Sequence, residues 1–107
     1  FMNFSNVASN YNMQYLRMYD SDTNNAFYLE VSTDGGFTWN AIASETLTGS
    51  ESPNIRPLND WQTRTVNLNA YRSVANTAVT FRFRVDSRSA STGGDGYYIT
   101  DILVIQN

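Results

Sequence analysis

The sequence contains no cysteine, no histidine and no lysine. Without cysteine and histidine, the chain has no thiol nucleophile, no disulfide, no Ser-His or Cys-His catalysis and none of the usual zinc or haem ligands. Its seven arginines are scattered, and a net charge of −3 leaves no basic patch that could neutralise many phosphates. Carboxylates and hydroxyls are the remaining reactive groups, and nucleic acid is not an expected partner.

Long apolar runs are also missing. No stretch approaches the ~18 apolar residues of a membrane-spanning helix, and the N-terminus lacks the basic-then-apolar pattern of a signal peptide. The first residue is Phe1 rather than methionine, which is typical of a processed product or an excised domain. A surface rich in Asn, Ser and Thr and free of lysine favours an extracellular location.

Alternating apolar and polar residues dominate what the sequence does contain. With 14% aromatic and only 16% charged residues, the composition indicates a folded, β-rich chain, and 107 residues suffice for one domain with its own core. Apolar residues recur with a period of two, and polar turns separate the runs. The predicted strands are 12–19, 26–32, 38–44, 62–68, 78–86 and 96–105, with residues 1–7 as a candidate seventh.

The strand pattern predicts an all-β fold of the antiparallel sandwich or barrel type. In 26–32 and 78–86 every second residue is apolar, so one face of each strand is expected to be buried and the other to face water. On the outer face, Arg82 or Arg84 is expected to pair with Glu30. Strand 96–105 is apolar on both faces, which predicts a central or covered position.

The octet "STDGGFTW" (residues 32–39) follows one of these strands. Ser32, Asp34, Gly36, Thr38 and Trp39 match the Ser-x-Asp-x-Gly-x-Thr-Trp pattern known as an Asp-box. A carboxylate can accept backbone N–H bonds across such a turn, glycine permits positive φ, and the indole can pack back on the hairpin. Every residue has a turn role available, so we expect a structural hairpin rather than a ligand site.

The Asp-box and three further segments occur in an order that resembles a known type of domain. The segments "YLEVSTDGGFTW", "WQTRTVNLNAY", "VTFRFRVDS" and "GGDGYYITDILV" resemble the jelly-roll domains beside bacterial secreted metalloproteases, and the related MAM-like and reelin-like sandwich modules. The resemblance implies a non-catalytic extracellular β-jelly-roll that holds structural calcium and serves as an accessory, adhesion or ligand-binding module. It covers roughly residues 26–105.

The chain departs from this family pattern in two places. Thr100 stands where the first Asp of a closing Asp pair is expected, which leaves only Asp101. The family domain also has more N-terminal strand than residues 1–7 supply, so the sheet is expected to lack an edge strand or to borrow one. We therefore expect one domain over residues 1–107, in which residues 1–11 form an extended arm or an incomplete edge strand.

Carboxylates close to one another suggest a metal site. Asp20 and Asp22 lie two residues apart before a strand, and alternating carboxylates can chelate calcium. A structural calcium held by some of Asp20, Asp22 and Asp101 is one hypothesis, and a solvated turn is the other. Of the three glutamates, none is placed by sequence in a cleft that would raise its pKa for glycoside hydrolysis, so we do not expect an enzyme.

Exposed aromatic side chains are the better sign of binding, because they stack on sugar rings and anchor protein interfaces. The candidates, each of which could instead pack at the edge of the core, are Tyr19, Tyr28, Trp61, Tyr71 and Tyr97. The expected partners are other domains of a parent protein, a polysaccharide or a cell-surface protein. The alternative function is a structural subunit of an extracellular filament or surface layer that self-assembles by β-strand addition.

Overall fold

The computed structural model describes residues 1–20, 25–48, 61–87 and 96–107. Almost all regular structure in these ranges is β-strand, and two short 3₁₀ turns complete it. The elements in chain order are β1 (Tyr11–Asp20), β2 (Asn25–Ser32), β3 (Asn40–Ala41), η1 (Ala43–Glu45), β4 (Leu47–Thr48), β5 (Gln62–Asn67), η3 (Asn69–Tyr71), β6 (Thr80–Ser87) and β7 (Gly96–Gln106).

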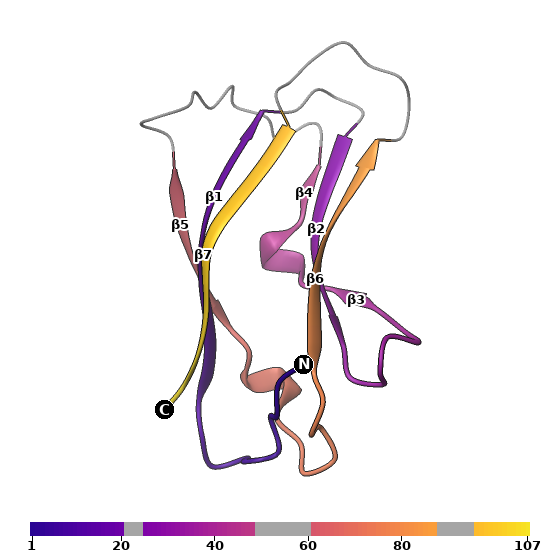
Figure 1. Cartoon of the computed structure of the whole chain (residues 1–107), viewed down its shortest axis with the longest axis vertical. Helices are drawn as coiled ribbons and strands as arrows, with labels where there is room; N and C mark the ends of the chain where they lie inside the picture. Colours follow the sequence, from indigo (N-terminus) through magenta and orange to yellow (C-terminus); the bar gives the residue numbers. More distant parts are fainter. Residues whose placement is uncertain (21–24, 49–60, 88–95) are drawn as a thin grey trace.

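The strands form two antiparallel sheets that pack face to face (Figure 1). One sheet has the order β5-β1-β7. In the other, β2 is central, β6 pairs along one side of it, and the short strands β3 and β4 pair with successive parts of its other side, so this sheet is also three strands wide. The predicted all-β sandwich is confirmed.

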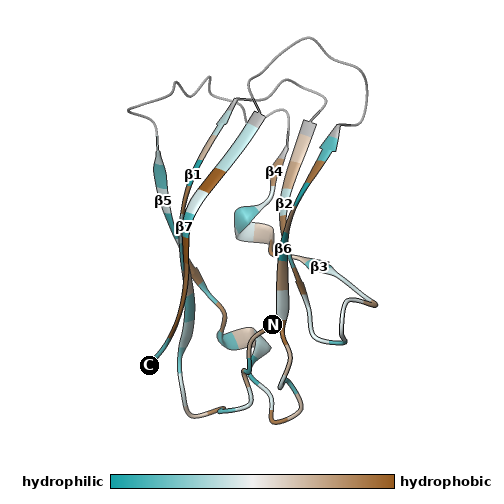
Figure 2. Ribbon diagram, viewed as in Figure 1, coloured by the Kyte–Doolittle hydropathy of each residue, from teal (hydrophilic) through white to brown (hydrophobic). Residues whose placement is uncertain are grey.

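The core lies between the two central strands. Inward-facing residues of β1 and β2 are almost completely buried, including Tyr11, Tyr15, Leu29 and Val31. Figure 2 shows the alternation behind this burial along β6, where hydrophobic and hydrophilic residues follow each other in turn. Since paired residues share a face of the sheet, the register Phe83↔Leu29 puts the apolar residues of β6 on the same inner face.

The predicted strand 38–44 is wrong over most of its length. Only Asn40–Ala41 pairs with β2, and the chain then turns through η1. The backbone N–H of Ile42 donates to the carbonyl of Leu29 at 2.8 Å, and this bond directs the turn inwards. As a result Ile42 and Glu45 are both buried, which a strand with alternating faces would not achieve for residues three apart.

The predicted central or covered position of strand 96–105 is also wrong, because β7 is an edge strand of its sheet. Its pairing with β1 contains a β-bulge, in which Asp101 and Ile102 both lie opposite Tyr15. Asp101 has φ +56°, the left-handed conformation that such bulges use. The bulge breaks the simple alternation of faces along β7, so its apolar pattern could not be interpreted as that of a regular strand.

The first residues of the chain do not form a seventh strand. Met2 makes one isolated antiparallel bridge with Val79, with backbone N–H···O distances of 2.7 and 2.6 Å. Two residues later, Phe4 is buried and its ring stacks on Tyr11 with centroids 4.3 Å apart. This segment therefore lies along its own sandwich, just before the start of β6.

Candidate functional site

The Asp-box forms a hairpin turn whose polar groups bind one another. Ser32 Oγ lies 2.8 Å from Asp34 Oδ1 and accepts the Gly36 N–H at 2.9 Å. The second half of the turn is held by Asp34, which accepts the Thr38 N–H at 2.9 Å as well as the Thr38 hydroxyl. Trp39 closes the turn by donating its indole N–H to the Gly36 carbonyl at 3.0 Å.

Hydrogen bonding also fixes the charge of the Asp-box. The bonds from the Thr38 hydroxyl and backbone, together with Ser32, lower the pKa of Asp34 to about 2. Asp34 is solvent-exposed and remains ionised down to strongly acidic pH. All of its hydrogen bonds described here serve the turn itself, and the side chain that the turn presents to solvent is Phe37, which is 90% exposed.

A row of stacked charged and aromatic side chains crosses the outer face of the second sheet. Glu30 accepts hydrogen bonds from Arg82 Nε at 2.8 Å and from Arg84 Nε at 3.0 Å. The Arg82 guanidinium lies 4.1 Å from the Trp39 ring, and that of Arg84 lies 4.3 Å from the Tyr28 ring. The expected pairing of Glu30 is confirmed with both arginines, although Glu30 is buried beneath them rather than exposed.

The second described glutamate, Glu45, lies inside the sandwich. Its carboxylate accepts hydrogen bonds from Tyr15 Oη at 2.8 Å and from Arg64 Nε and Nη2 at 2.9 and 2.8 Å. Arg17 approaches to 4.0 Å, and its Nη1 is buried without a hydrogen-bond partner in the described residues. The sequence analysis missed this cluster, because it placed Glu45 after a strand that does not form.

The environments of Glu30 and Glu45 favour the ionised carboxylate. Burial raises the pKa of each, but hydrogen bonds from arginines outweigh it and bring both below the usual value. A general acid at neutral pH would need the opposite shift. Neither described glutamate is therefore suited to acid catalysis, and Glu51 lies outside the described residues.

The tyrosines predicted to bind ligand do not form one surface. Tyr19 is buried, and Tyr28 lies under Arg84 on the outer face. Tyr71 packs against the core from η3, and Tyr97 faces inwards, with its ring 4.6 Å from that of Phe27. Among these candidates the most exposed is Trp61, which lies just before β5 and is 39% exposed. Of these side chains, the structure brings together Tyr19 and Tyr97, which pair across β1 and β7 in a buried cluster with Phe27.

Two of the three predicted calcium ligands, Asp20 and Asp101, have their backbone on the paired strands β1 and β7. Asp20 pairs with Gly96, five residues from Asp101, so the two backbone positions are roughly 16 Å apart along the strand. Carboxylates of one calcium site lie much closer, since each oxygen is within about 2.6 Å of the ion. The side chain of Asp20 and the whole of Asp22 lie outside the described part of the chain. The described residues contain no cluster of three or more potential metal ligands.

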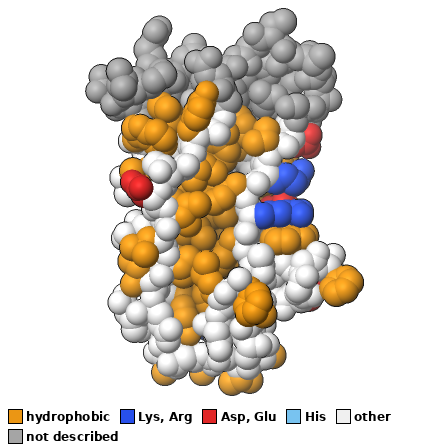
Figure 3. Space-filling view, in the orientation of Figure 1, with side chains coloured by type: hydrophobic (Ala, Val, Ile, Leu, Met, Phe, Trp, Pro, Cys, Tyr) orange, Lys and Arg blue, Asp and Glu red, His pale blue; other side chains and the backbone are white. Residues whose placement is uncertain are grey.

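The most distinctive surface is the side of the sandwich formed by β6 and β7, where no described element covers the core. On β2, the inward residues Leu29 and Val31 are at most 1% exposed, whereas Val85, on the inner face of β6, is 53% exposed. Figure 3 shows a continuous band of hydrophobic side chains on this side. We call this surface the apolar strip, and it comprises Phe81, Phe83, Val85, Ile99 and Val104.

The opposite side of the sandwich is closed. There, β3, η1 and β4 follow the Asp-box, and Ile42, Glu45 and Leu47 are buried against the core. On the strip side, β6 and β7 approach each other only through side chains, such as Phe83 and Tyr97, whose ring centroids are 6.4 Å apart. The contrast follows from topology, because β6 and β7 are edge strands and no described element lies over the space between them.

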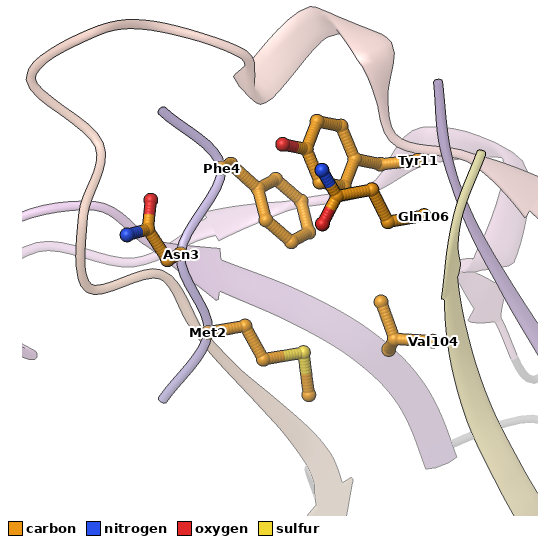
Figure 4. Close-up of a pocket in the computed structure, with 6 residues that line it drawn as sticks. All are labelled: Met2, Asn3, Phe4, Tyr11, Val104 and Gln106. Atoms are coloured by element: carbon orange, nitrogen blue, oxygen red, sulfur yellow. The ribbon is translucent and has the colours of Figure 1, made fainter. Parts of the chain in front are cut away.

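A pocket opens at the end of the strip that lies beside the first residues of the chain (Figure 4). Its volume is about 450 Å³, and it is lined by Met2, Asn3, Phe4, Tyr11, Val104 and Gln106. The stacked rings of Phe4 and Tyr11 form its inner wall, while Met2 and Val104 face each other across it. The strip and the pocket together are the candidate site, and their chemistry suits apolar side chains rather than a metal or a phosphate.

No helix in the described ranges is long and apolar enough to span a membrane. Comparisons with protein-family models, with curated proteins and with solved structures find no match to this chain. The site therefore has to be interpreted from its own geometry, and the family resemblance rests on the motifs quoted above.

Proposed function

We propose that this chain is a non-catalytic binding or accessory module of a secreted or cell-surface protein, with a β-jelly-roll type of fold. The apolar strip is the observation that carries the proposal. Monomeric soluble proteins rarely leave contiguous apolar surface of this kind open to water, and such surfaces mark sites of interaction. The partner is a protein, either a neighbouring domain or a cell-surface protein.

The polar features of the molecule support a binding role over catalysis. The Asp-box carboxylate is used by its own turn, and the two described glutamates are neutralised by arginines. A polysaccharide is a weaker candidate than a protein. Tyr19 and Tyr97 face the core, and Tyr28 is already covered by Arg84. An open row of aromatic faces, which sugar rings require, is therefore not formed by these residues.

Self-assembly through the N-terminal arm is also disfavoured as the main function. An arm donated to a neighbouring copy would have to leave its own chain, and Phe4 is buried and stacked on Tyr11. The calcium that the resemblance implies remains part of the proposal as a structural ion near Asp20 and Asp22. It predicts a lower melting temperature in chelator, because an ion bound only to the folded state stabilises that state.

Photo-crosslinking tests the proposed binding function. A photoreactive phenylalanine analogue replaces Val85 in the strip, and Leu103, which is equally exposed but lies on the outer face of the other sheet, is the matched control position. After irradiation in the producing cells, we expect a discrete adduct with a polypeptide from position 85 and none from position 103. Equal labelling at both positions, or labelling of polysaccharide alone, would contradict the proposal.

A further inference from the structure

We propose that the partner binds as an extended β-strand that pairs antiparallel with the free edge of β6 and places its side chains on the apolar strip. This inference rests on the proposed binding function and specifies how the partner is recognised. The occupant is a strand from a polypeptide outside residues 1–107. It adds a fourth strand to the width of the β6-β2 sheet and covers the core between β6 and β7.

The first step of this pairing already exists within the chain. Val79 exchanges two backbone hydrogen bonds with Met2 on the side away from β2. Backbone N–H and C=O groups of successive strand residues point to opposite sides, so those of Phe81, Phe83 and Val85 are directed to the same side as Val79. Apart from the Met2 bridge, no described residue pairs with this edge of β6.

The backbone and side-chain requirements coincide at the same residues. Phe81, Phe83 and Val85 direct their backbone groups to the open edge, and their side chains belong to the apolar strip. A strand that continues the line of Met2 along β6 would therefore satisfy their hydrogen bonds and cover their side chains together. An apolar patch on the outer face of a sheet would offer burial of side chains but no backbone hydrogen bonds.

The edge of β7 is less suited to accept a strand. At Asp101 the positive φ and the extra residue of the bulge interrupt its regular hydrogen-bonding edge. Natural proteins use bulges in this way to limit pairing at sheet edges. Of the two strands that border the strip, β6 offers the longer uninterrupted edge, Thr80–Ser87, and no register shift occurs in its pairing with β2.

The residues of β6 also specify the chemistry of the bound strand. Residues opposite Phe81, Phe83 and Val85 would face the strip, so they should be apolar. Residues opposite Arg82 and Arg84 would lie on the outer face, beside two arginine side chains that are about two-fifths exposed. Both arginines already bind Glu30, and Asp86 lies 4.0 Å from Arg84. Acidic side chains are favoured there, and the expected motif alternates apolar with acidic or neutral polar residues.

The same charges disfavour a second copy of this chain as the occupant. In a symmetric antiparallel pair of β6 strands, the registers that pair most of the strand are centred on Phe83 or Arg84. The register centred on Phe83 places Arg84 opposite Arg82 of the other copy, and like charges directly opposite destabilise a sheet. The register centred on Arg84 opposes the two Arg84 side chains but also sets each Arg82 opposite Asp86, so it is the register that light scattering has to exclude. Pairing centred on Phe83 would also displace Met2 from Val79.

Synthetic peptides of about seven residues test this inference, since this length covers the free edge. The probe alternates Val with Glu and is titrated against isotope-labelled protein by NMR. We expect saturable binding, with amide shifts in β6 and beside Val79. A peptide with Lys in place of Glu should bind about tenfold more weakly, because it meets the two arginines. A peptide of the same composition with its Val residues grouped together should not bind.

Backbone methylation distinguishes strand addition from simple apolar docking. Methylation of the Val amides should abolish binding, because these N–H groups point to β6, whereas methylation of the Glu amides should be tolerated. Val85→Glu should weaken binding at least about tenfold by burying a charge, and the equally exposed control Leu103→Glu should not. The two substitutions carry the same charge, and both leave the free protein folded, because both side chains are about half exposed.

Three results would overturn the inference. If both methylated peptides bind equally well, the strip binds apolar partners without strand pairing, and the proposed binding function survives alone. If the unmodified peptide shows no saturation at millimolar concentration while crosslinks still form at position 85, the partner is not a strand. A dimer in light scattering that Val85→Glu makes monomeric would show that a second copy is the occupant.

Discussion

Replacing Glu45 with glutamine is expected to destabilise this protein strongly, because Glu45 is the buried acceptor of an ion-pair cluster. Glu45 is 1% exposed and is the acceptor for Tyr15 and Arg64, while Arg17 lies 4.0 Å away. Glutamine preserves the shape and one acceptor oxygen, but it removes the negative charge. The buried Arg17, whose side chain is 7% exposed, then has no counter-charge within the cluster.

The size of the effect follows from the burial of the partners. Breaking a buried ion pair from one side costs about 3–5 kcal/mol. The lower end applies here, because the Arg64 side chain is one-third exposed and water can solvate it after the change. We therefore expect a loss of about 3 kcal/mol in the free energy of unfolding. For a domain of this size, this corresponds to a fall of roughly 12–20 °C in Tm.

Urea denaturation at pH 7 measures this loss, with Arg64→Gln and the double variant completing a thermodynamic cycle. The double variant should lose less than the sum of the two single changes, because Glu45 and Arg64 contact each other. The pKa of Glu45 is lowered in the folded state, so its contribution is present above its ordinary value of 4.5 and is lost as the pH falls below that value. Additive losses, or a loss below about 1 kcal/mol for Glu45→Gln, would refute this account of the cluster.

Three further predictions test the core, the Asp-box turn and its charge. Leu29→Ala should cost about 3 kcal/mol in urea denaturation. Val85→Ala should cost less than about 1 kcal/mol, and equal losses would show that the strip is covered. Gly35→Ala should lower the free energy of unfolding by about 1 kcal/mol, because φ is +78° there, a conformation that strains alanine. The added Cβ would contact no other atom, so no packing gain offsets this strain. Asp34→Asn should lower Tm at pH 7 but not at pH 2: the folded pKa of about 2 lies below the ordinary 3.8, so the stabilisation is present above pH 4 and is lost as the pH falls towards 2. A pH-independent difference in Tm would contradict that assignment.

Alternation was sufficient to predict the parts of the fold that are regular. The predicted strand 26–32 pairs along its whole length with residues 80–86, and the pairing of Glu30 with Arg82 and Arg84 follows from their common outer face. Of the predicted strand 78–86, only Ala78 and Val79 lie outside this pairing. Such runs carry their face assignment in the sequence, because a slip of one residue would reverse every side chain. The sandwich class could be inferred for the same reason.

The irregular parts depended on contacts that lie far away in the chain. Residues 38–44 alternate like a strand, but the inward turn at η1 is fixed by a bond from Ile42 to Leu29 and by the binding of Glu45 to Arg64. Neither partner is near in sequence. The bulge at Asp101 is only weakly marked: Asp is the residue of "YYITDILVI" that best tolerates positive φ, but this preference does not show that an extra residue is inserted there.

The candidate site had one signal in the sequence, which was interpreted in the opposite sense. Apolar residues on both faces of 96–105 predicted that other strands cover this segment. In the structure β7 is an edge strand, and its inward residues Ile99 and Val104 belong to the apolar strip. Leu103, on the outer face, is about half exposed but lies outside the strip. The composition thus indicated apolar surface that requires a cover, but it did not show that the described chain leaves that surface open.

The pairing of β1 between β5 and β7 has a consequence for how the chain is synthesised. Tyr11 pairs with Gln106, so an early central strand has as one neighbour the described strand that is farthest along the sequence. At about 5–20 residues per second, the ribosome needs several seconds to reach that neighbour after β1 has been translated. During this interval β2 can pair with β3 and β4 nearby in sequence, whereas β1 has no local partner. The sheet that closes last is therefore β5-β1-β7, whose central strand stays without its partners until β5 and β7 have been translated.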